Sequence, residues 1–441
     1  MRMLRHLAPA FVALALAWGP TLPAPAAAQR LPRVMPADAG MSATRLDRLT
    51  DALETYVRDR RLPGASVMVL RDGAVVYEAT VGMADLEART PVVPGTLYRI
   101  ASQTKAVVSV AVMMLQEEGR LLIGDRVSDY LPGFAATTVA EPREGGGYDV
   151  RPARRPITIR DLLTHTAGID YGYGPARDRW SEAGVQGWYF ADRSESIRAT
   201  VARMAALPMA AHPGEAWVYG YATDVLGAVV EVVSGLTLDA FLRSQILDPL
   251  GMRDTRFYLP PEQAGRLAAV YNGSADGPVR RAPDGAGMQT QGQYVIGQGP
   301  ATSFSGGAGL VSTAEDYARF LQMLLNGGEL DGVRLLSPTT VDLMTRNHVG
   351  DLFGGGAEGG LGFGLGFQVV LDQGATGRPA SDGTFSWGGA YHSTYWVDPA
   401  EGLVVVYFTQ VVPAPGLDDH ARLEALVYQA VVESRTGAGA R

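Results

Sequence analysis

Patterns typical of β-strands lie near the two ends of this chain, and patterns typical of helices fill the long stretch between them. The early strands are "ASVMVL" and "AVVYEATVG" around an Asp72-Gly73 turn, and the late ones are "FGLGFQVVL", "TFSWGG", "STYWVD" and "LVVVYFTQ". Amphipathic segments occupy residues of about 120–345. The order predicts an α+β fold, in which residues of about 40–100 and 360–434 form one antiparallel sheet flanked by helices and the mostly helical region is inserted.

A single lysine gives the strongest chemical signal in the chain. Of 38 lysines and arginines, only Lys105 in "ASQTKAVVSV" is a lysine. Arginine stays charged in a protein, whereas a buried lysine can become a neutral amine that accepts and returns a proton. A position that avoids arginine is therefore expected to serve in proton transfer.

The neighbours of Lys105 support that role. The segment from Ser102 to Glu118 is predicted to be a helix, and its apolar residues cover nearly every face, so we expect it to be buried. Ser102 precedes Lys105 by three positions, which places both side chains on one face of the helix. The buried amine could accept the serine proton, and the Ser102 N–H at the helix start could bind an oxyanion.

The Ser-x-x-Lys spacing also fits a serine that caps a helix ahead of a solvated lysine. The lack of lysine elsewhere and the apolar helix favour catalysis. The sequence has no Gly-x-Ser-x-Gly elbow and no His-Glu-x-x-His zinc motif. His165 in "LLTHTAG" is predicted to pack against a helix end, and His392 alone is weak support for a base.

The N-terminus predicts export. Arg2 and Arg5 precede the apolar run "LAPAFVALALAW", and "AAAQ" offers a cleavage site after Ala28. This run is shorter than the ~20 residues of a membrane span. We therefore expect residues 1–28 to be a signal peptide, with no stable membrane anchor and a periplasmic or secreted product.

The composition excludes two further classes of function. A formal net charge of −8 without basic runs argues against a nucleic-acid partner, and the absence of cysteine excludes disulfides and thiolate chemistry.

Three stretches together resemble the serine β-lactamase and penicillin-binding protein family, in particular its class C-like branch with the family VIII carboxylesterases. They are "SQTK", "PGEAWVYGYATDVLG" and "FSWGGAYHSTYWVDP", and the resemblance extends over residues of about 40–430. It implies a β-lactamase/transpeptidase-like fold for a hydrolase domain of residues 29–441, and a covalent acyl-enzyme on a serine.

The same resemblance implies roles for particular residues. Tyr219 would take the place of the motif tyrosine, hydrogen-bond Ser102 and Lys105, and relay the proton. The N–H groups of Ser102 and Ala390 would form the oxyanion hole, with Gly388 and Gly389 in the strand edge beside it.

Two departures from the family pattern bear on the substrate. Tyr221 occupies the asparagine position of Tyr-x-Asn, so the amide-binding contact of β-lactamases is in doubt. Trp387-Gly388-Gly389 replaces Lys-Thr-Gly, which removes the cation that would hold a β-lactam carboxylate. Both positions, as substrate contacts, point toward an esterase.

These observations predict an exported serine hydrolase that acts on a small-molecule ester or amide, with an ester as the favoured substrate and with no metal or cofactor. The alternatives are a D-aminopeptidase or DD-peptidase-like enzyme, a β-lactamase and, from another class, an inactive binding relative. The sequence carries no signal for an oligomeric state. The segment "DYGYGPARDRWSEAGVQGWYF" either rims an acyl or alcohol pocket or packs as a loop on its own aromatic residues, which are Tyr171, Tyr173, Trp180, Trp188, Tyr189 and Phe190.

Overall fold

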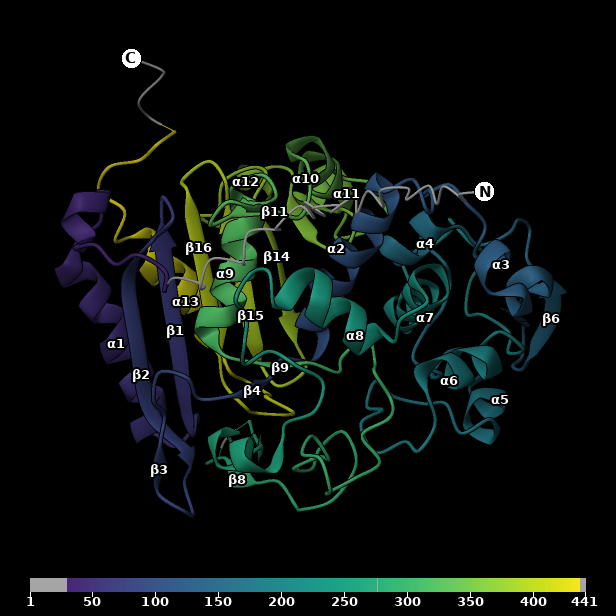
Figure 1. Ribbon diagram of the computed structural model, residues 1–441, viewed down its shortest axis with the longest axis horizontal. Coiled ribbons are helices and arrows are strands. Elements are labelled where there is room, and N and C mark those ends of the chain that lie inside the picture. Colours follow the sequence, from purple (N-terminus) through teal and green to yellow (C-terminus); the bar gives the residue numbers. More distant parts are fainter. Residues whose placement is uncertain (1–29, 276, 437–441) are drawn as a thin grey trace, which may run out of the picture.

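A computed structural model of the 441-residue chain describes residues 30–275 and 277–436 (Figure 1). The predicted signal peptide, residues 1–28, lies outside the described residues. The main sheet has eight strands in the order β12-β13-β14-β15-β16-β1-β2-β3, and all neighbouring strands are antiparallel. The strands are β1 (Gly64–Arg71), β2 (Ala74–Asp85), β3 (Thr90–Pro91), β12 (Leu361–Phe363), β13 (Gln368–Val370), β14 (Phe385–Gly389), β15 (Ser393–Asp398) and β16 (Leu403–Phe408).

The two chain ends meet in the middle of this sheet, where β1 pairs with β16. Every residue of β1 is buried, and its side chains alternate between two cores. Met68 and Leu70 pack into the core that contains α2 and α9, whereas Val67 and Val69 pack into the core that contains α1 and α13. Helices therefore cover both faces of the sheet, as the strand patterns at the two ends predicted.

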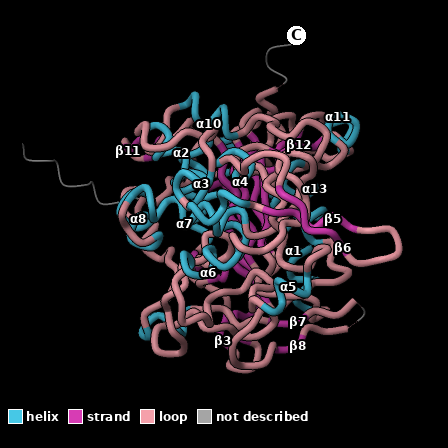
Figure 2. The backbone as a smooth tube through the Cα atoms, turned by 90° about the vertical axis from the view of Figure 1, so that its right-hand side faces the viewer, coloured by secondary structure: helices cyan, strands magenta, loops and turns pink. Residues whose placement is uncertain are grey.

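The helical region lies between β4 and β9 in the chain and occupies the right-hand part of Figure 1. Figure 2 looks onto this side, where the β5–β6 hairpin extends from the helices. The helices of the chain are α1 (Ala43–Arg58), α2 (Thr104–Glu117), α3 (Val127–Tyr130), α4 (Ile159–Leu163), α5 (Arg177–Glu182), α6 (Ile197–Met204), α7 (Ala222–Ser234), α8 (Leu238–Leu242), α9 (Ala314–Leu325), α10 (Pro338–Met344), α11 (Gly356–Gly359), α12 (Gln373–Thr376) and α13 (Asp419–Tyr428). The remaining short strands pair in twos and are β4 (Tyr98–Arg99) with β9 (Val311–Ser312), β5 (Thr138–Pro142) with β6 (Tyr148–Pro152), β7 (Tyr271–Asn272) with β8 (Arg280–Arg281), and β10 (Glu329–Leu330) with β11 (Val333–Arg334).

Helix α2 connects the sheet to the helical region. All its residues from Thr104 to Met113 are buried, and it packs against α7. The prediction of a buried helix at this position is therefore confirmed, and so is the α+β fold with its antiparallel sheet. The helix begins two residues later than predicted, because Ser102 lies in a preceding 3-10 turn.

No single helix of the described chain is long and apolar enough to cross a membrane. The helices Ala222–Ser234 and Leu238–Leu247 meet the length and composition requirement only as a pair, and they are bent by 76° at the break between them.

Candidate active site

Ser102 lies on the 3-10 turn Ala101–Gln103, which joins β4 to α2. Ala101 has a φ of 41°, in the left-handed region that residues other than glycine rarely adopt, so the chain turns sharply there. Ser102 is 8% exposed and lines a cavity of about 960 Å³. Its backbone N–H donates to no other described residue, which leaves this donor available to a ligand.

Lys105 lies in the first turn of α2 and is only 2% exposed. Its Nζ is 3.2 Å from Ser102 Oγ, 3.0 Å from Tyr171 Oη and 2.7 Å from the carbonyl oxygen of Gly307. Because a carbonyl oxygen can only accept, one N–H of the amine is fixed on Gly307. A neutral amine then has one N–H and one lone pair for the two hydroxyls, which is what a base for Ser102 requires.

The tyrosine bonded to Lys105 is Tyr171 and not the predicted Tyr219. Tyr219 turns its ring toward the amine, with Nζ 4.7 Å from the ring centroid, and its hydroxyl accepts a hydrogen bond of 3.0 Å from Trp387 Nε1. The described side chains include no hydrogen bond from Tyr219 to Ser102 or Lys105. Burial, and next the charge of Tyr219, raises the pKa of Tyr171 well above its ordinary value, so Tyr171 is a protonated hydroxyl.

Strand β14 brings the predicted glycine pair to the serine turn. A Cβ atom on Gly389 would lie 2.4 Å from the carbonyl oxygen of Ile100, so only glycine allows this approach. The Ala390 N–H, directly after β14, donates to no described residue, and Ala390 lines the same cavity as Ser102. Two unpaired backbone donors therefore face one cavity, as an oxyanion hole requires.

A buried carboxylate holds the peptide that contacts Lys105. Asp224 Oδ1 accepts hydrogen bonds from Ser305 Oγ at 2.6 Å and from Gly307 N at 3.1 Å, and Ser305 Oγ accepts one from Ala308 N at 3.2 Å. The Ala308 N–H and the Gly307 carbonyl belong to one peptide group, so this chain of bonds orients the carbonyl toward the amine. Burial raises the pKa of Asp224, while the Ser305 hydrogen bond and the charge of Lys105 act in the opposite direction.

One wall of the cavity is aromatic. The Trp387 ring lies 5.3 Å from the Tyr219 ring and 5.3 Å from that of Phe363, measured between centroids. His165 is buried behind this wall, with its ring 4.8 Å from Tyr219. Burial and then the charge of Lys105 lower the pKa of His165 well below its ordinary value, so it is a neutral packing residue, as the sequence predicted.

The prediction that Tyr221 contacts substrate is wrong. Tyr221 is fully buried, its ring stacks between Trp180 and Phe190, and its hydroxyl donates to the Gly187 carbonyl at 2.8 Å. Its position just before α7 turns the side chain into the core of the helical region, away from the cavity.

The predicted aromatic segment combines both alternatives. Tyr171 and Trp188 line the cavity, whereas Trp180, Tyr189 and Phe190 are buried in the core.

The remaining predicted contacts, Trp387, Gly388 and Gly389, line the cavity together with Ser102 and Tyr219. Sequence patterns missed the contacts of Tyr171, Asp224 and Gly307 around the amine. Tyr171 lies three residues after the stretch "LLTHTAG", and only the fold reveals which nearby tyrosine reaches the amine.

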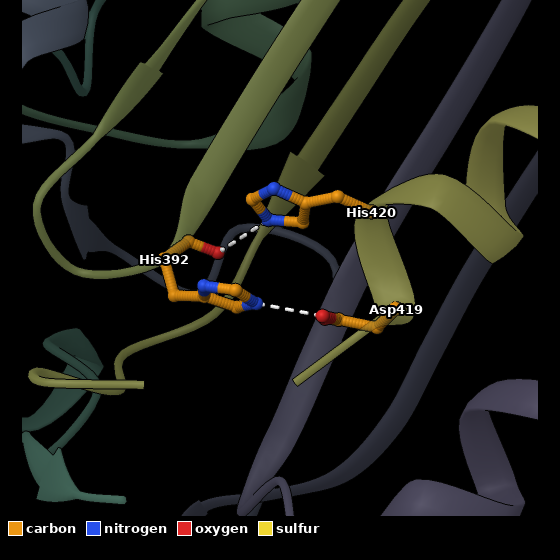
Figure 3. Close-up of side chains that lie close together, drawn as sticks. All are labelled: His392, Asp419 and His420. Carbon is orange, nitrogen blue, oxygen red and sulfur yellow. Dashed lines mark hydrogen bonds and ion pairs between the residues drawn. The ribbon is translucent and has the colours of Figure 1, made fainter. Parts of the chain in front are cut away.

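One group of side chains in the described chain has the residue types of a metal site, namely His392, Asp419 and His420 (Figure 3). The two imidazole rings are stacked, with centroids 4.1 Å apart and planes 18° from parallel. Nitrogen lone pairs lie in the ring planes, so those of stacked rings do not converge on one ion, and His392 Nε2 is already bonded to Asp419 Oδ1 at 2.6 Å. This arrangement does not fit a metal centre.

The antiparallel sheet, the helical region beside it and the Ser-x-x-Lys pair between them define a serine hydrolase with a β-lactamase/transpeptidase-like fold. The comparisons agree, because the "Beta-lactamase" family model matches residues 49–429, and the chain belongs to that family. It is 35% identical to the esterase EstB of Burkholderia gladioli over 391 residues, covering 86% of this chain and 93% of EstB.

Solved structures give the same result. The chain is similar to EstCE1, a hydrolase with promiscuous acyltransferase activity, with a TM-score of 0.74 and 29% identity over 88% of this chain and 99% of EstCE1. It is also similar to the simvastatin synthase LovD of Aspergillus terreus, with a TM-score of 0.71 and 26% identity over 88% of this chain and 98% of LovD. The relatives therefore place the chain among esterase-like serine hydrolases of the β-lactamase family.

Proposed function

We propose that the protein is an exported esterase that hydrolyses small, largely apolar esters through an acyl-enzyme on Ser102. The observation that carries the proposal is the position of Lys105 Nζ, 3.2 Å from Ser102 Oγ and only 2% exposed, beside two unpaired backbone N–H groups. A nucleophile, a base and oxyanion donors in one cavity are the parts that acyl transfer needs.

In the acylation step, Ser102 Oγ attacks the ester carbonyl while its proton passes to the lone pair of Lys105. The carbonyl oxygen becomes an oxyanion and is held by the Ser102 and Ala390 N–H groups. The ammonium is stabilised by the Gly307 carbonyl at 2.7 Å and by the buried Asp224 behind it. The tetrahedral intermediate then collapses, the alcohol leaves with a proton delivered from Lys105, and the acyl group stays on the serine.

Deacylation repeats these steps with water. The neutral amine takes a proton from a water molecule that attacks the acyl carbonyl, and the proton returns to Ser102 Oγ when the acid leaves. Tyr171, bonded to Lys105 at 3.0 Å, and Tyr219, with its ring over the amine, are the hydroxyls that could carry the proton between the lysine and the departing or entering oxygen.

The aromatic wall supports an ester rather than a β-lactam as the substrate. Trp387 provides apolar area at the position where the family carries a lysine, and its indole N–H is already bonded to Tyr219. A neutral ester loses no binding interaction when tryptophan stands there in place of lysine. A carboxylate next to the scissile bond would be desolvated without gaining an ion pair to a lysine.

Export is the second part of the proposal, and it depends on the N-terminal sequence. Arg2 and Arg5, the apolar run after them and the small residues before Gln29 have the order of a cleaved signal peptide. N-terminal sequencing of the protein from a periplasmic fraction should begin near Gln29. A product that starts at Met1 in the cytoplasm would contradict this part alone.

A fluorophosphonate probe tests the nucleophile directly. We expect the wild-type protein to be labelled on Ser102, and Ser102→Ala to lose both labelling and ester hydrolysis at an unchanged Tm. Ser386→Ala is the matched control, because Ser386 lines the same cavity but has no base beside it. Persistent labelling of Ser102→Ala would refute the assignment, and faster turnover of a D-amino acid amide or a cephalosporin than of short-chain p-nitrophenyl esters would refute the substrate class.

A further inference from the structure

The cavity that contains Ser102 extends to a polar end beside helix α13. Its lining there includes Arg378, His392, His420 and Glu424, in contrast to the aromatic wall around Trp387. Two ion pairs occupy this end. Arg378 donates through Nε at 2.9 Å and through Nη2 at 2.6 Å to Glu424 Oε2, and His392 Nε2 lies 2.6 Å from Asp419 Oδ1.

In both pairs the basic side chain is more exposed than its acidic partner, although Glu424 also lines the cavity. The side chain of Arg378 is 45% exposed and that of Glu424 is 7% exposed, while His392 is 15% and Asp419 is 1% exposed. The described chain has no acceptor for Arg378 Nη1 or for His392 Nδ1. A ligand at this end therefore meets unused nitrogen atoms of an arginine and a histidine, while the carboxylates of Glu424 and Asp419 are largely buried and already hydrogen-bonded.

One face of α13 brings the two pairs together. His420 and Glu424 are four residues apart on this helix, so their side chains are neighbours one turn apart. His420 stacks on His392 at a centroid distance of 4.1 Å and bonds to its carbonyl oxygen through Nε2 at 3.2 Å (Figure 3). The imidazole of His392 and the guanidinium of Arg378 are thereby held over adjacent turns of the same helix.

The backbone at His392 argues that its side chain is kept for a purpose. His392 ends the tight turn between β14 and β15 and has a φ of 63°, a left-handed conformation that favours glycine. A side chain is less favourable than glycine in this backbone conformation, so the turn itself does not require an imidazole here. His392 lines the cavity from this turn.

We infer that the α13 end of the cavity is a subsite for a carboxylate group carried by the ester substrate, which Arg378 and the imidazolium form of His392 bind by charge-assisted hydrogen bonds. This inference rests on the proposed function and specifies its substrate class: an ester with an apolar part for the aromatic wall and a carboxylate several bonds away from the scissile carbonyl.

Arg378 and His392 offer different groups to a carboxylate. Neutral His392 donates through Nε2 to Asp419, so its Nδ1 is an acceptor, and only the imidazolium form can donate to a carboxylate. The groups around it are Asp419, Tyr407 and His420, with the Arg378–Glu424 pair across the cavity. Burial acts against the carboxylate of Asp419, but the His392 hydrogen bond holds its pKa below the ordinary value, while burial and His392 lower the pKa of His420.

The test compares esters that differ only in charge. In one arm the acyl part carries the carboxylate, as in p-nitrophenyl hemiglutarate and hemiadipate, and the matching glutaramate and adipamate monoamides are the neutral partners. In the other arm the alcohol carries it, as in carboxyphenyl butyrate against carbamoylphenyl butyrate. We expect kcat/KM for the carboxylate ester to exceed that of its amide about tenfold in one arm, mainly through KM.

Two variants and a control identify the residues. Arg378→Gln together with Glu424→Gln keeps a hydrogen-bonded pair without leaving a buried acid unpaired, and we expect it to reduce the ratio to about one. His392→Gly suits the local backbone and should lower the ratio of the two kcat/KM values. Arg422→Gln, which changes an exposed charge on α13 paired with Asp418, is the matched control and should leave the ratio as it is.

Equal kcat/KM for the charged and neutral esters in both arms would overturn the subsite while leaving the esterase proposal intact. So would a ratio that survives both variants. If no ester is hydrolysed and Ser102 is not labelled by the fluorophosphonate, the proposed function is refuted, and so is the subsite that depends on it.

Discussion

Replacing Lys105 by arginine keeps the positive charge at the site and removes the base. A guanidinium does not give up its proton in a protein, so Lys105→Arg can still donate to Gly307, Tyr171 and Ser102 but can accept nothing. We expect kcat on p-nitrophenyl butyrate to fall by about 10²- to 10⁴-fold, the usual contribution of a positioned base. At 1.36 kcal/mol for each factor of ten, this is a loss of about 3–5 kcal/mol of transition-state stabilisation.

The structure also indicates how misfolding can be separated from loss of the base. Lys105 is 2% exposed and its Nζ is surrounded by three oxygen atoms, so the larger guanidinium could disturb the packing of α2. Thermal unfolding of Lys105→Arg measures this directly. Lys105→Ala, which leaves a cavity at the same place, should regain activity when a small primary amine is added to the assay, whereas added guanidine should not restore it. Wild-type kcat in Lys105→Arg would refute the assignment of the base.

Further predictions concern the groups around the serine and the lysine. Asp224→Asn keeps the side-chain shape but removes the counter-charge of the ammonium, so kcat should fall about tenfold with little change in KM. Gly389→Ala would place a Cβ 2.4 Å from a carbonyl oxygen of the serine turn, and the resulting shift of the oxyanion donor should lower kcat about 100-fold in the same assay. Wild-type enzyme should prefer p-nitrophenyl esters over a cephalosporin by about tenfold or more in kcat/KM, and Trp387→Lys should narrow that gap. Burial alone would raise the pKa of Asp161, but the hydrogen bonds from Arg155 help to hold this pKa below its ordinary value. The ionised carboxylate therefore stabilises the fold at neutral pH, and this stabilisation is lost as the pH falls below about 4. The Tm of Asp161→Asn should accordingly decline less than that of the wild type as the pH is lowered.

The sequence could predict those parts of the fold whose hydrophobic pattern lies within a single strand or helix. The uninterrupted apolar run of β1 is typical of a strand covered on both faces, and the uniformly apolar α2 predicts a buried helix. Each pattern depends only on how many sides of one element face solvent. The pairing of Ser102 with Lys105 is equally local, since it depends on one turn of one helix. The same reasoning did not detect the 3-10 turn that carries Ser102, because a positive φ at Ala101 leaves no compositional trace.

The contacts that could not be predicted join segments far apart in the chain. Tyr171 is 66 residues from the lysine that it contacts, and Gly307 is 202 residues away. Nothing in the spacing of aromatic residues indicates that Tyr171 reaches the amine while Tyr219 contacts it only through its ring. Tyr221 was wrongly placed for the same reason, since a motif position specifies a neighbour in sequence, and the direction of its side chain depends on how α7 packs.

The distribution of charge along the cavity connects the chemistry to the choice of substrate. Among the described residues, Lys105 is the basic side chain that contacts Ser102. It becomes an ammonium when it takes the serine proton, so a permanent cation on β14 would oppose that step through repulsion. Trp387 at that position leaves the catalytic end free of a second positive charge. Arg378 and His392 lie at the other end, where their charges are balanced by Glu424 and Asp419. A carboxylate several bonds from the scissile carbonyl would therefore meet Arg378 and His392, whereas a carboxylate beside the carbonyl, as in a β-lactam, would meet Trp387 in place of a cation.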